Sequence, residues 1–129
     1  MARIKETKEP LWSFVDYRVE EINSIESSLA WMKTHLLNSG IEIECFLFTN
    51  PDRYDDGGFE KQYDSFESLE RAIKMIDDCS NQLSVECEAI YEEVSFTISI
   101  LAFRQEMFIM YPTTSNLNIE QIEEKLKLI

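Results

Sequence analysis

The chain has little of what most catalytic and metal-binding sites require. It has one histidine, His35, and three cysteines without a CxxC spacing, so the sequence shows no cluster of the kind that holds zinc. The glycine-rich motifs of nucleotide-binding loops and the GxSxG motif of hydrolases are absent. We therefore predict a protein that is not an enzyme, with no catalytic residues, no metal site and no cofactor. A catalytic Cys–His pair that is brought together only in the folded protein would contradict this prediction.

Long apolar runs are also missing. The longest, such as ILAF at 100–103, are only a few residues and too short to span a membrane. The opening residues MARIKETKEP carry charges with no apolar region behind them, which predicts no signal peptide. Cys45, Cys79 and Cys87 form an odd, unpaired set that is typical of free thiols in a reducing compartment. These features predict a cytoplasmic protein.

Basic residues are scarce: 12 Lys and Arg stand against 25 Asp and Glu, for a net charge of −13. The imbalance is uneven, because residues 75–103 contain six acids and no base, and residues 41–70 contain nine acids and two bases. Lys and Arg supply most of the affinity for phosphates and for anionic membranes, so direct binding of nucleic acid or membrane is disfavoured. The acidity serves either solubility or a basic protein partner.

Glycine and proline are few, with three of each, and none lies between Phe59 and Tyr111. That half of the chain should therefore consist of regular elements joined by tight polar turns. At 129 residues we expect a single domain, 1–129. Within it we predict a flexible N-terminal segment, 1–10, and a C-terminal helix in 113–129.

Three stretches begin as helices do. Each offers a capping residue and a partner three positions later, in the pairs Asn23/Glu26, Asp64/Glu67 and Asn118/Gln121. Apolar residues at helical spacing follow the first two caps: Ile25, Leu29, Met32 and Leu36, then Phe66, Leu69, Ile73 and Ile76. We predict two to three helices.

Elsewhere the apolar period is two. Residues 83–89, 94–100 and 106–111 alternate and predict three antiparallel strands in a meander, and 41–48 is another strand. Residues 15–22 fit both a strand and a helix, and the cap at Asn23 favours a strand. The order is then β-α-β-loop-α-β-β-β-α. We predict an α+β fold with a mainly antiparallel sheet of four to five strands and the helices packed on it.

The connection NPDRYDDGGFEKQYDSFES, residues 50–68, is unusually acidic. A calcium loop beginning at Asp52 would need oxygen ligands where Tyr54 and Tyr63 stand. The NP and GG pairs are instead typical of turns. We predict an exposed acidic loop without a specific calcium site.

Two kinds of surface are expected on the sheet. Glu86 and Glu88 should point the same way on one strand, as should Glu42 and Glu44. Such pairs can serve glycoside chemistry but more often form a solvated face. Several aromatic residues and one methionine lie outside the helix stripe or on the second face of a strand, and indicate either a two-sided core or an interface: Trp12, Phe14, Phe46, Phe48, Phe108 and Met110.

Together these features predict a non-enzymatic acidic binding protein that neutralises or inhibits a basic, nucleic-acid-acting protein. In size, charge and lack of a catalytic signature the chain resembles small acidic immunity proteins that block nuclease toxins. In a related hypothesis, the acidic side chains mimic the phosphates of a nucleic acid and so inhibit an enzyme that acts on DNA or RNA. The alternatives are a structural or assembly subunit, or a homodimer that uses an apolar sheet face, and then a small enzyme or ligand-binding domain. The predicted partner-binding residues are Asp52, Asp55, Asp56, Glu60, Glu86, Glu88, Glu92 and Glu93.

Overall fold

The computed structural model describes residues 11–49, 60–75, 84–101 and 104–128. These residues form one antiparallel sheet of six strands with three helices, so the predicted α+β class is confirmed. The elements in chain order are β1 (Trp12–Arg18), α1 (Ile25–Trp31), η1 (Met32–Leu36), β2 (Glu42–Thr49), β3 (Glu60–Tyr63), α2 (Phe66–Lys74), β4 (Ser84–Tyr91), β5 (Val94–Leu101), β6 (Glu106–Pro112) and α3 (Ile119–Lys125).

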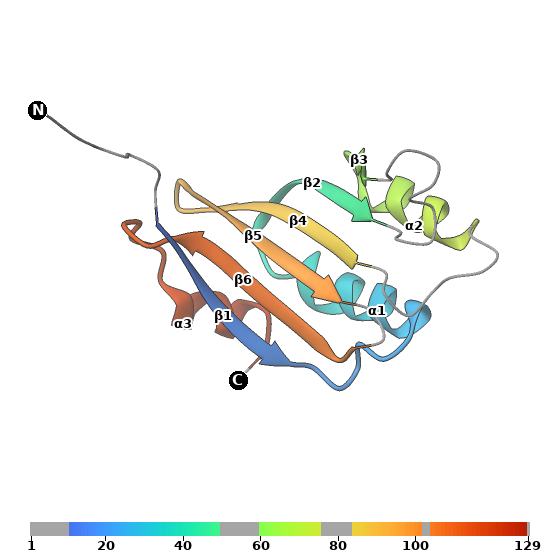
Figure 1. The fold of residues 1–129 in the computed structure, drawn as a ribbon, viewed down its shortest axis with the longest axis horizontal. Helices are drawn as coiled ribbons and strands as arrows, with labels where there is room; N and C mark the ends of the chain where they lie inside the picture. Colours follow the sequence, from blue (N-terminus) through green and yellow to red (C-terminus); the bar gives the residue numbers. More distant parts are fainter. Residues whose placement is uncertain (1–10, 50–59, 76–83, 102–103, 129) are drawn as a thin grey trace, which may run out of the picture.

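The strands lie in the order β1-β6-β5-β4-β2-β3, and each neighbouring pair is antiparallel (Figure 1). The meander β4-β5-β6 is the one that the period-two pattern predicts. β1 confirms the strand interpretation of the ambiguous N-terminal stretch, although it ends at Arg18 rather than at the cap. Pairing of the backbone continues one residue beyond β1, because Val19 N–H donates to the carbonyl of Gln105, in the turn before β6, over 2.9 Å.

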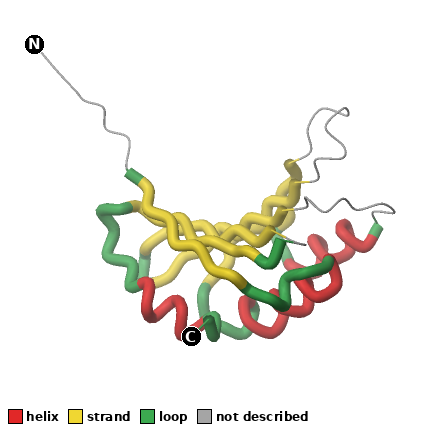
Figure 2. The backbone as a smooth tube through the Cα atoms, turned by 60° about the horizontal axis from the view of Figure 1, so that its bottom comes forward, coloured by secondary structure: helices red, strands yellow, loops and turns green. Residues whose placement is uncertain are grey.

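All three helices lie on one side of the twisted sheet (Figure 2). The core lies between the two layers. It includes the predicted helix residues Leu29, Met32 and Leu36 of α1 and η1, and Phe66, Leu69 and Ile73 of α2. None of the described helices has the length and apolar character needed to cross a membrane.

Two of the predicted helix caps are displaced by one residue. The N-caps are Ser24 and Ser65, whose hydroxyl oxygens accept from the backbone N–H groups three residues on, at 3.1 and 3.2 Å. Asn23 and Asp64 therefore lie outside their helices. The later start leaves Glu26 and Glu67 in the first turn, where the positive end of the helix dipole favours an acid. The third cap, Asn118, accepts from Gln121 N–H as predicted.

A β-bulge in β2 overturns the expected arrangement of its side chains. Ile43 pairs with Ala89 and Cys45 pairs with Glu88, so Glu44 is an extra residue in the ladder. An extra residue reverses the alternation beyond it. Phe46 and Phe48 therefore face the helices and are buried, which corrects their predicted place on the second face. For the same reason Glu42 and Glu44 do not form a pair like Glu86 and Glu88.

β3 is the strand that the sequence pattern did not predict. Its four residues, EKQY, pair with β2 in the register Phe46↔Tyr63, within what was expected to be loop and turn. A short polar strand has no apolar alternation to reveal it. The sheet consequently has six strands instead of four to five, and the described part of the acidic connection begins at this edge.

Candidate functional site

One face of the sheet carries no described helix or strand, and we call it the open face. It looks toward the viewer in Figure 1 and away from the helices in Figure 2. The ladder registers place its residues in rows that cross the strands from β1 toward β2. One row is Phe14, Met110, Thr97, Glu88 and Cys45, and the next is Asp16, Phe108, Ser99, Glu86 and Leu47.

The part of the open face formed by the beginning of β1 and the end of β6 is apolar. Trp12 and Phe14 are 46% and 59% exposed, and the ring of Phe14 lies against that of Phe108 with centroids 5.9 Å apart. Met110 lies directly opposite Phe14. The prediction that Phe108 and Met110 occupy the second face of their strand is thus confirmed. Exposed aromatic and methionine side chains are enriched at protein interfaces.

The central strand of this face carries small polar residues that are nevertheless buried. Thr97 and Ser99 are only 7% and 3% exposed, although no described element covers them. Their larger neighbours on β4 and β6 provide the shelter. The Thr97 hydroxyl donates weakly to both carboxylate oxygens of Glu88, at 3.4 and 3.5 Å. The Glu88 side chain therefore extends toward β5.

Acids predominate on the open face. Its described charged residues are five acids, Asp16, Glu42, Glu86, Glu88 and Glu106, and one base, Arg18. Arg18 donates to the side-chain oxygen of Gln105 over 2.6 Å. At the rim, Arg104 lies 3.7 Å from Glu106 in a solvent-exposed ion pair. Glu86 lies two strands from Phe108 of β6, and Asp16 lies directly opposite Phe108, so a negative and an apolar region adjoin.

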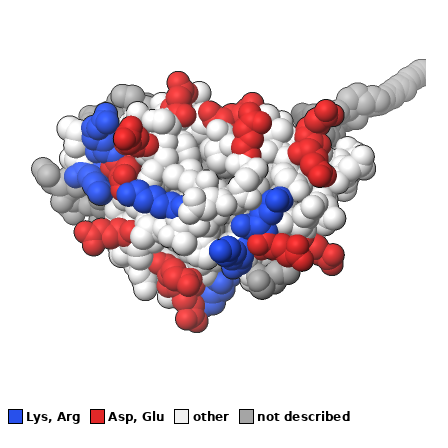
Figure 3. Space-filling model, turned by 180° about the vertical axis from the view of Figure 1, so that it is seen from behind, with Lys and Arg blue, Asp and Glu red and all other residues white. Residues whose placement is uncertain are grey.

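The helix layer is charged differently. Seen from behind, its surface shows Lys and Arg interspersed with Asp and Glu (Figure 3). Its helices and their ends carry six acids and five bases: Glu26, Glu67, Glu70, Glu120, Glu123 and Glu124, with Lys33, Arg71, Lys74, Lys125 and Lys127. The open face thus has a net charge of −4 and the helices and their ends a net charge of −1, while further acids lie in turns, such as Glu20, Glu21, Glu92 and Glu93.

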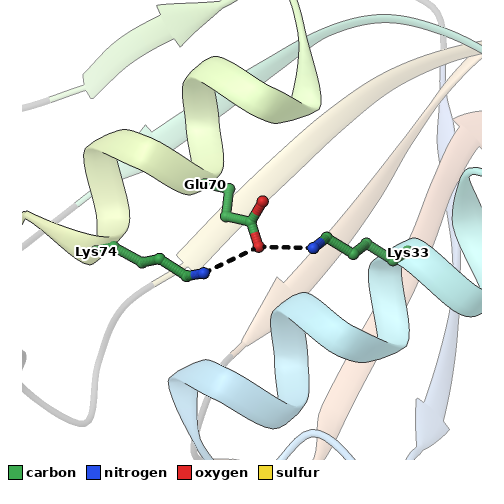
Figure 4. Close-up of polar contacts among 3 residues, drawn as sticks. All are labelled: Lys33, Glu70 and Lys74. Carbon is green, nitrogen blue, oxygen red and sulfur yellow. Dashed lines mark ion pairs between the residues drawn. The ribbon is translucent and has the colours of Figure 1, made fainter.

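Glu70 shows how the helix layer uses its bases. Its carboxylate lies 3.0 Å from Lys33 Nζ and 3.4 Å from Lys74 Nζ, so it joins η1 to α2 (Figure 4). The hydrogen bond and charge of Lys33, followed by the hydrogen bond and charge of Lys74, lower the pKa of Glu70 although burial opposes the shift. Lys33 and Lys74 are thus engaged in ion pairs with Glu70 within the helix layer.

The predicted site residues that the structure describes fall in three places. Glu86 and Glu88 lie side by side on the open face of β4, as expected. Glu92 and Glu93 are exposed in the turn that joins β4 to β5. The backbone of Glu60 begins β3 at the far edge of the sheet. Asp52, Asp55 and Asp56 lie outside the described residues.

Sequence reasoning missed two acids of the open face, Asp16 and Glu106. Asp16 lies opposite Phe108, and Glu106 lies opposite Arg18 at the end of the same ladder. Each is two positions from an apolar residue that was singled out, Phe14 for Asp16 and Phe108 for Glu106. Because side chains two apart share a face of a strand, that spacing was the signal that could have found them.

The turn at Glu92 and Glu93 has an uncommon backbone. Their φ angles are 50° and 69°, and the flanking residues Tyr91 and Val94 pair directly, as in a two-residue type I′ turn. Asn-Gly is the preferred sequence there, since the Cβ of an L-residue crowds the backbone carbonyl at positive φ, while Gly has no Cβ and Asn tolerates this conformation. The two carboxylates are thus presented at a hairpin tip on a conformation that glutamate rarely adopts.

The single histidine and the described cysteines do not form a catalytic pair. The His35 ring stacks on Trp31 at 4.9 Å, and its Nδ1 is 2.9 Å from the carbonyl of Leu126. Cys45 faces the opposite side of the sheet from η1, and Cys87 is fully buried in the core. Burial first, and then Glu88, raises the pKa of both thiols. Cys79 lies outside the described residues.

Among the described side chains, no group of three or more His, Cys, Asp and Glu is arranged so that it could hold a metal ion. Comparison of the chain with protein-family models, with curated proteins and with solved structures gives no match. The arguments for a function therefore come from the open face itself.

Proposed function

We propose that this protein is a non-enzymatic binding protein whose open face docks a basic, nucleic-acid-acting protein and thereby neutralises it. The observation that carries the proposal is the separation of charge, with five acids and one base on the open face and a nearly balanced helix layer. Nucleic-acid-acting proteins suit such a face because they bind phosphates through clustered Lys and Arg.

The acidic residues would act mainly on association. Glu86 and Glu88, with Glu92 and Glu93 at the end of the same hairpin, provide a negative field that attracts a basic surface before contact. This field weakens with salt, since the Debye length falls from ~10 Å at 0.1 M to ~3 Å at 1 M ionic strength. Fast, salt-sensitive association is the expected kinetic signature.

The apolar residues would act mainly on dissociation. Trp12 and Phe14 expose aromatic surface beside the half-buried Phe108 and Met110. Aromatic side chains that become buried at an interface commonly dominate its binding energy. A partner with a basic region next to an apolar one would match both halves of the open face.

The first experiment is capture of the partner from native lysate at low and at high salt, with identification by mass. Binding kinetics then compare the wild type with Glu86→Gln/Glu88→Gln on the open face. The matched control is Glu120→Gln/Glu124→Gln on α3, which changes net charge equally but on the other side. We expect the first variant to lower the association rate several-fold and the control to have little effect.

Two results would reject this proposal. A captured partner that is acidic would remove the electrostatic argument. Equal effects of the two double variants would mean that only the net charge of −13 matters, and solubility would then explain the acidity. Activity of the partner with and without this protein tests neutralisation itself.

A second candidate function is assembly through the apolar half of the open face. The observation in its favour is the exposure of Trp12 and Phe14, at 46% and 59%, at one end of the open face. An assembly role would make Phe14→Ser weaken binding while Glu86→Gln/Glu88→Gln left it unchanged. The pair of variants therefore separates the two functions.

A further inference from the structure

The outer edge of β1 carries unsatisfied backbone groups among the described contacts. At the two ends of its ladder with β6, Thr113 N–H donates to Leu11 O over 2.8 Å, and Val19 N–H donates to Gln105 O over 2.9 Å. Hydrogen-bonded pairs alternate with non-bonded pairs in an antiparallel ladder. The odd-numbered residues of β1 therefore bond to β6, and the backbone groups of Trp12, Phe14, Asp16 and Arg18 point to the free edge.

The two edges of the sheet differ. β3 has four residues, EKQY, and so forms a short, polar edge of the kind that resists pairing with another chain. β1 has seven residues in unbroken register with β6, without proline or bulge. It also exposes Trp12 and Phe14. The edge at β1 thus has the length, regularity and apolar character that favour addition of a further strand.

We propose that a second copy of this chain pairs with the edge of β1, antiparallel, with Val15 opposite Val15 of the second copy. This register is the one that matches all seven residues of both strands. It pairs the outward-facing residues only with each other, Trp12 with Arg18 and Phe14 with Asp16 of the second copy. Each such pair exchanges two bonds, which gives about eight new backbone hydrogen bonds.

The side chains of the strand suit this register. No charged residue lies directly opposite a like charge, because Asp16 faces Phe14 and Arg18 faces Trp12. A guanidinium beside an indole ring is a favourable cation–π arrangement. Antiparallel edge pairing keeps both open faces on the same side. The apolar strips of Phe14, Phe108 and Met110 from the two copies would then meet at the centre of one continuous sheet.

The test is the oligomeric state of the full chain, measured by analytical ultracentrifugation across a wide concentration range. The main variant is Asp16→Pro, which removes an outward N–H and leaves the bonds to β6 in place. Its matched control is Asp16→Ala, which loses the same charge but keeps the N–H. We expect a reversible dimer for the wild type and for Asp16→Ala, and a dissociation constant at least about tenfold higher for Asp16→Pro.

Hydrogen exchange locates the interface even if Asp16→Pro fails to fold. In the wild type, the amides of Phe14, Asp16 and Arg18 should gain protection as concentration rises, while Val15 and Tyr17 are protected throughout. A monomer at all concentrations overturns the proposal. So does a dimer that Asp16→Pro leaves intact, or one whose protection lies elsewhere, such as on the sheet face.

Discussion

Phe46 lies opposite Cys87 in the β2-β4 ladder, on the side of the sheet that the helices cover. Its ring meets that of Phe66 from α2 in an edge contact, with centroids 6.0 Å apart. The adjacent Leu47 lies opposite Glu86 on the open face. The bulge at Glu44 shifts the alternation of side chains in β2 by one residue. This shift decides which residues of β2 build the core and which lie on the open face, where a partner can contact them.

Replacement of these neighbours should have unequal effects on stability. Phe46→Ala should lower the free energy of unfolding by about 3–5 kcal/mol, because it removes a ring that is 3% exposed and leaves a cavity. Leu47→Ala, on the half-exposed open face, should cost about 1 kcal/mol or less. Urea denaturation of both variants measures the difference. Similar losses would mean that Phe46 does not lie in the core.

Substitutions in the turn between β4 and β5 should raise the stability of the protein. Glu92→Asn/Glu93→Gly provides the preferred type I′ sequence at two positions of positive φ, so we expect the free energy of unfolding to rise by about 1–2 kcal/mol. Glu92→Gln/Glu93→Gln is the control, because it removes the same two charges without the turn preference. A rise equal in both variants would assign the gain to reduced charge repulsion and contradict the backbone argument.

Glu70 should make stability depend on pH at the acidic end. Its folded-state pKa is lowered, mainly by the hydrogen bond from Lys33, relative to the ordinary value of about 4.3. The ionised form is therefore favoured in the folded state, and its contribution is present above the ordinary pKa. That contribution disappears as the pH falls through the lowered pKa. Glu70→Gln should lose this part of the pH dependence, in denaturation curves measured between pH 6 and the acid limit of folding.

The loss in Glu70→Gln should be modest, since Lys33 and Lys74 remain 54% and 63% exposed and water screens the pairs. Lys33→Met should reproduce most of the change, and Lys74→Met less of it, because Lys33 makes the shorter contact. Equal effects of the two lysine variants would contradict the conclusion that Lys33 lowers the pKa of Glu70 more than Lys74 does.

The two described thiols should react slowly with iodoacetamide at neutral pH. A raised pKa leaves little thiolate, and Cys87 is also inaccessible in the core. We expect peptide mapping of the native protein to find Cys87 unmodified and Cys45 modified only slowly, with both modified in urea. Cys45→Ser should leave partner binding intact. Rapid native labelling of Cys87 would show that the core opens easily.

Much of the fold could be predicted from local patterns. The meander follows from the alternation in β4 and β5, where Val85, Cys87, Phe96 and Ile98 are buried as expected. The helix faces followed from apolar spacing, because buried helix residues recur every three to four positions. Two of the three caps were misplaced by one residue, since serine and its neighbouring Asn or Asp are nearly equivalent capping residues.

The candidate site could be predicted only in part. Glu86 and Glu88 were found because strand alternation places them together. Asp16 and Glu106 join them only because β1 lies at the sheet edge beside β6, and the order of strands is not a local property of the chain.

By itself the sequence determined the fold class, the central meander, the apolar faces of the helices and the excess of acid, because each depends on composition or on neighbours within a few residues. Only the tertiary structure decided that β3 completes the edge and that the bulge at Glu44 turns Phe46 inward. It also decided that all three helices cover one face and leave the acids of β1, β4 and β6 together on the other. These outcomes depend on pairing between residues far apart in the chain, and a shift of one residue in that pairing exchanges the two faces of a strand.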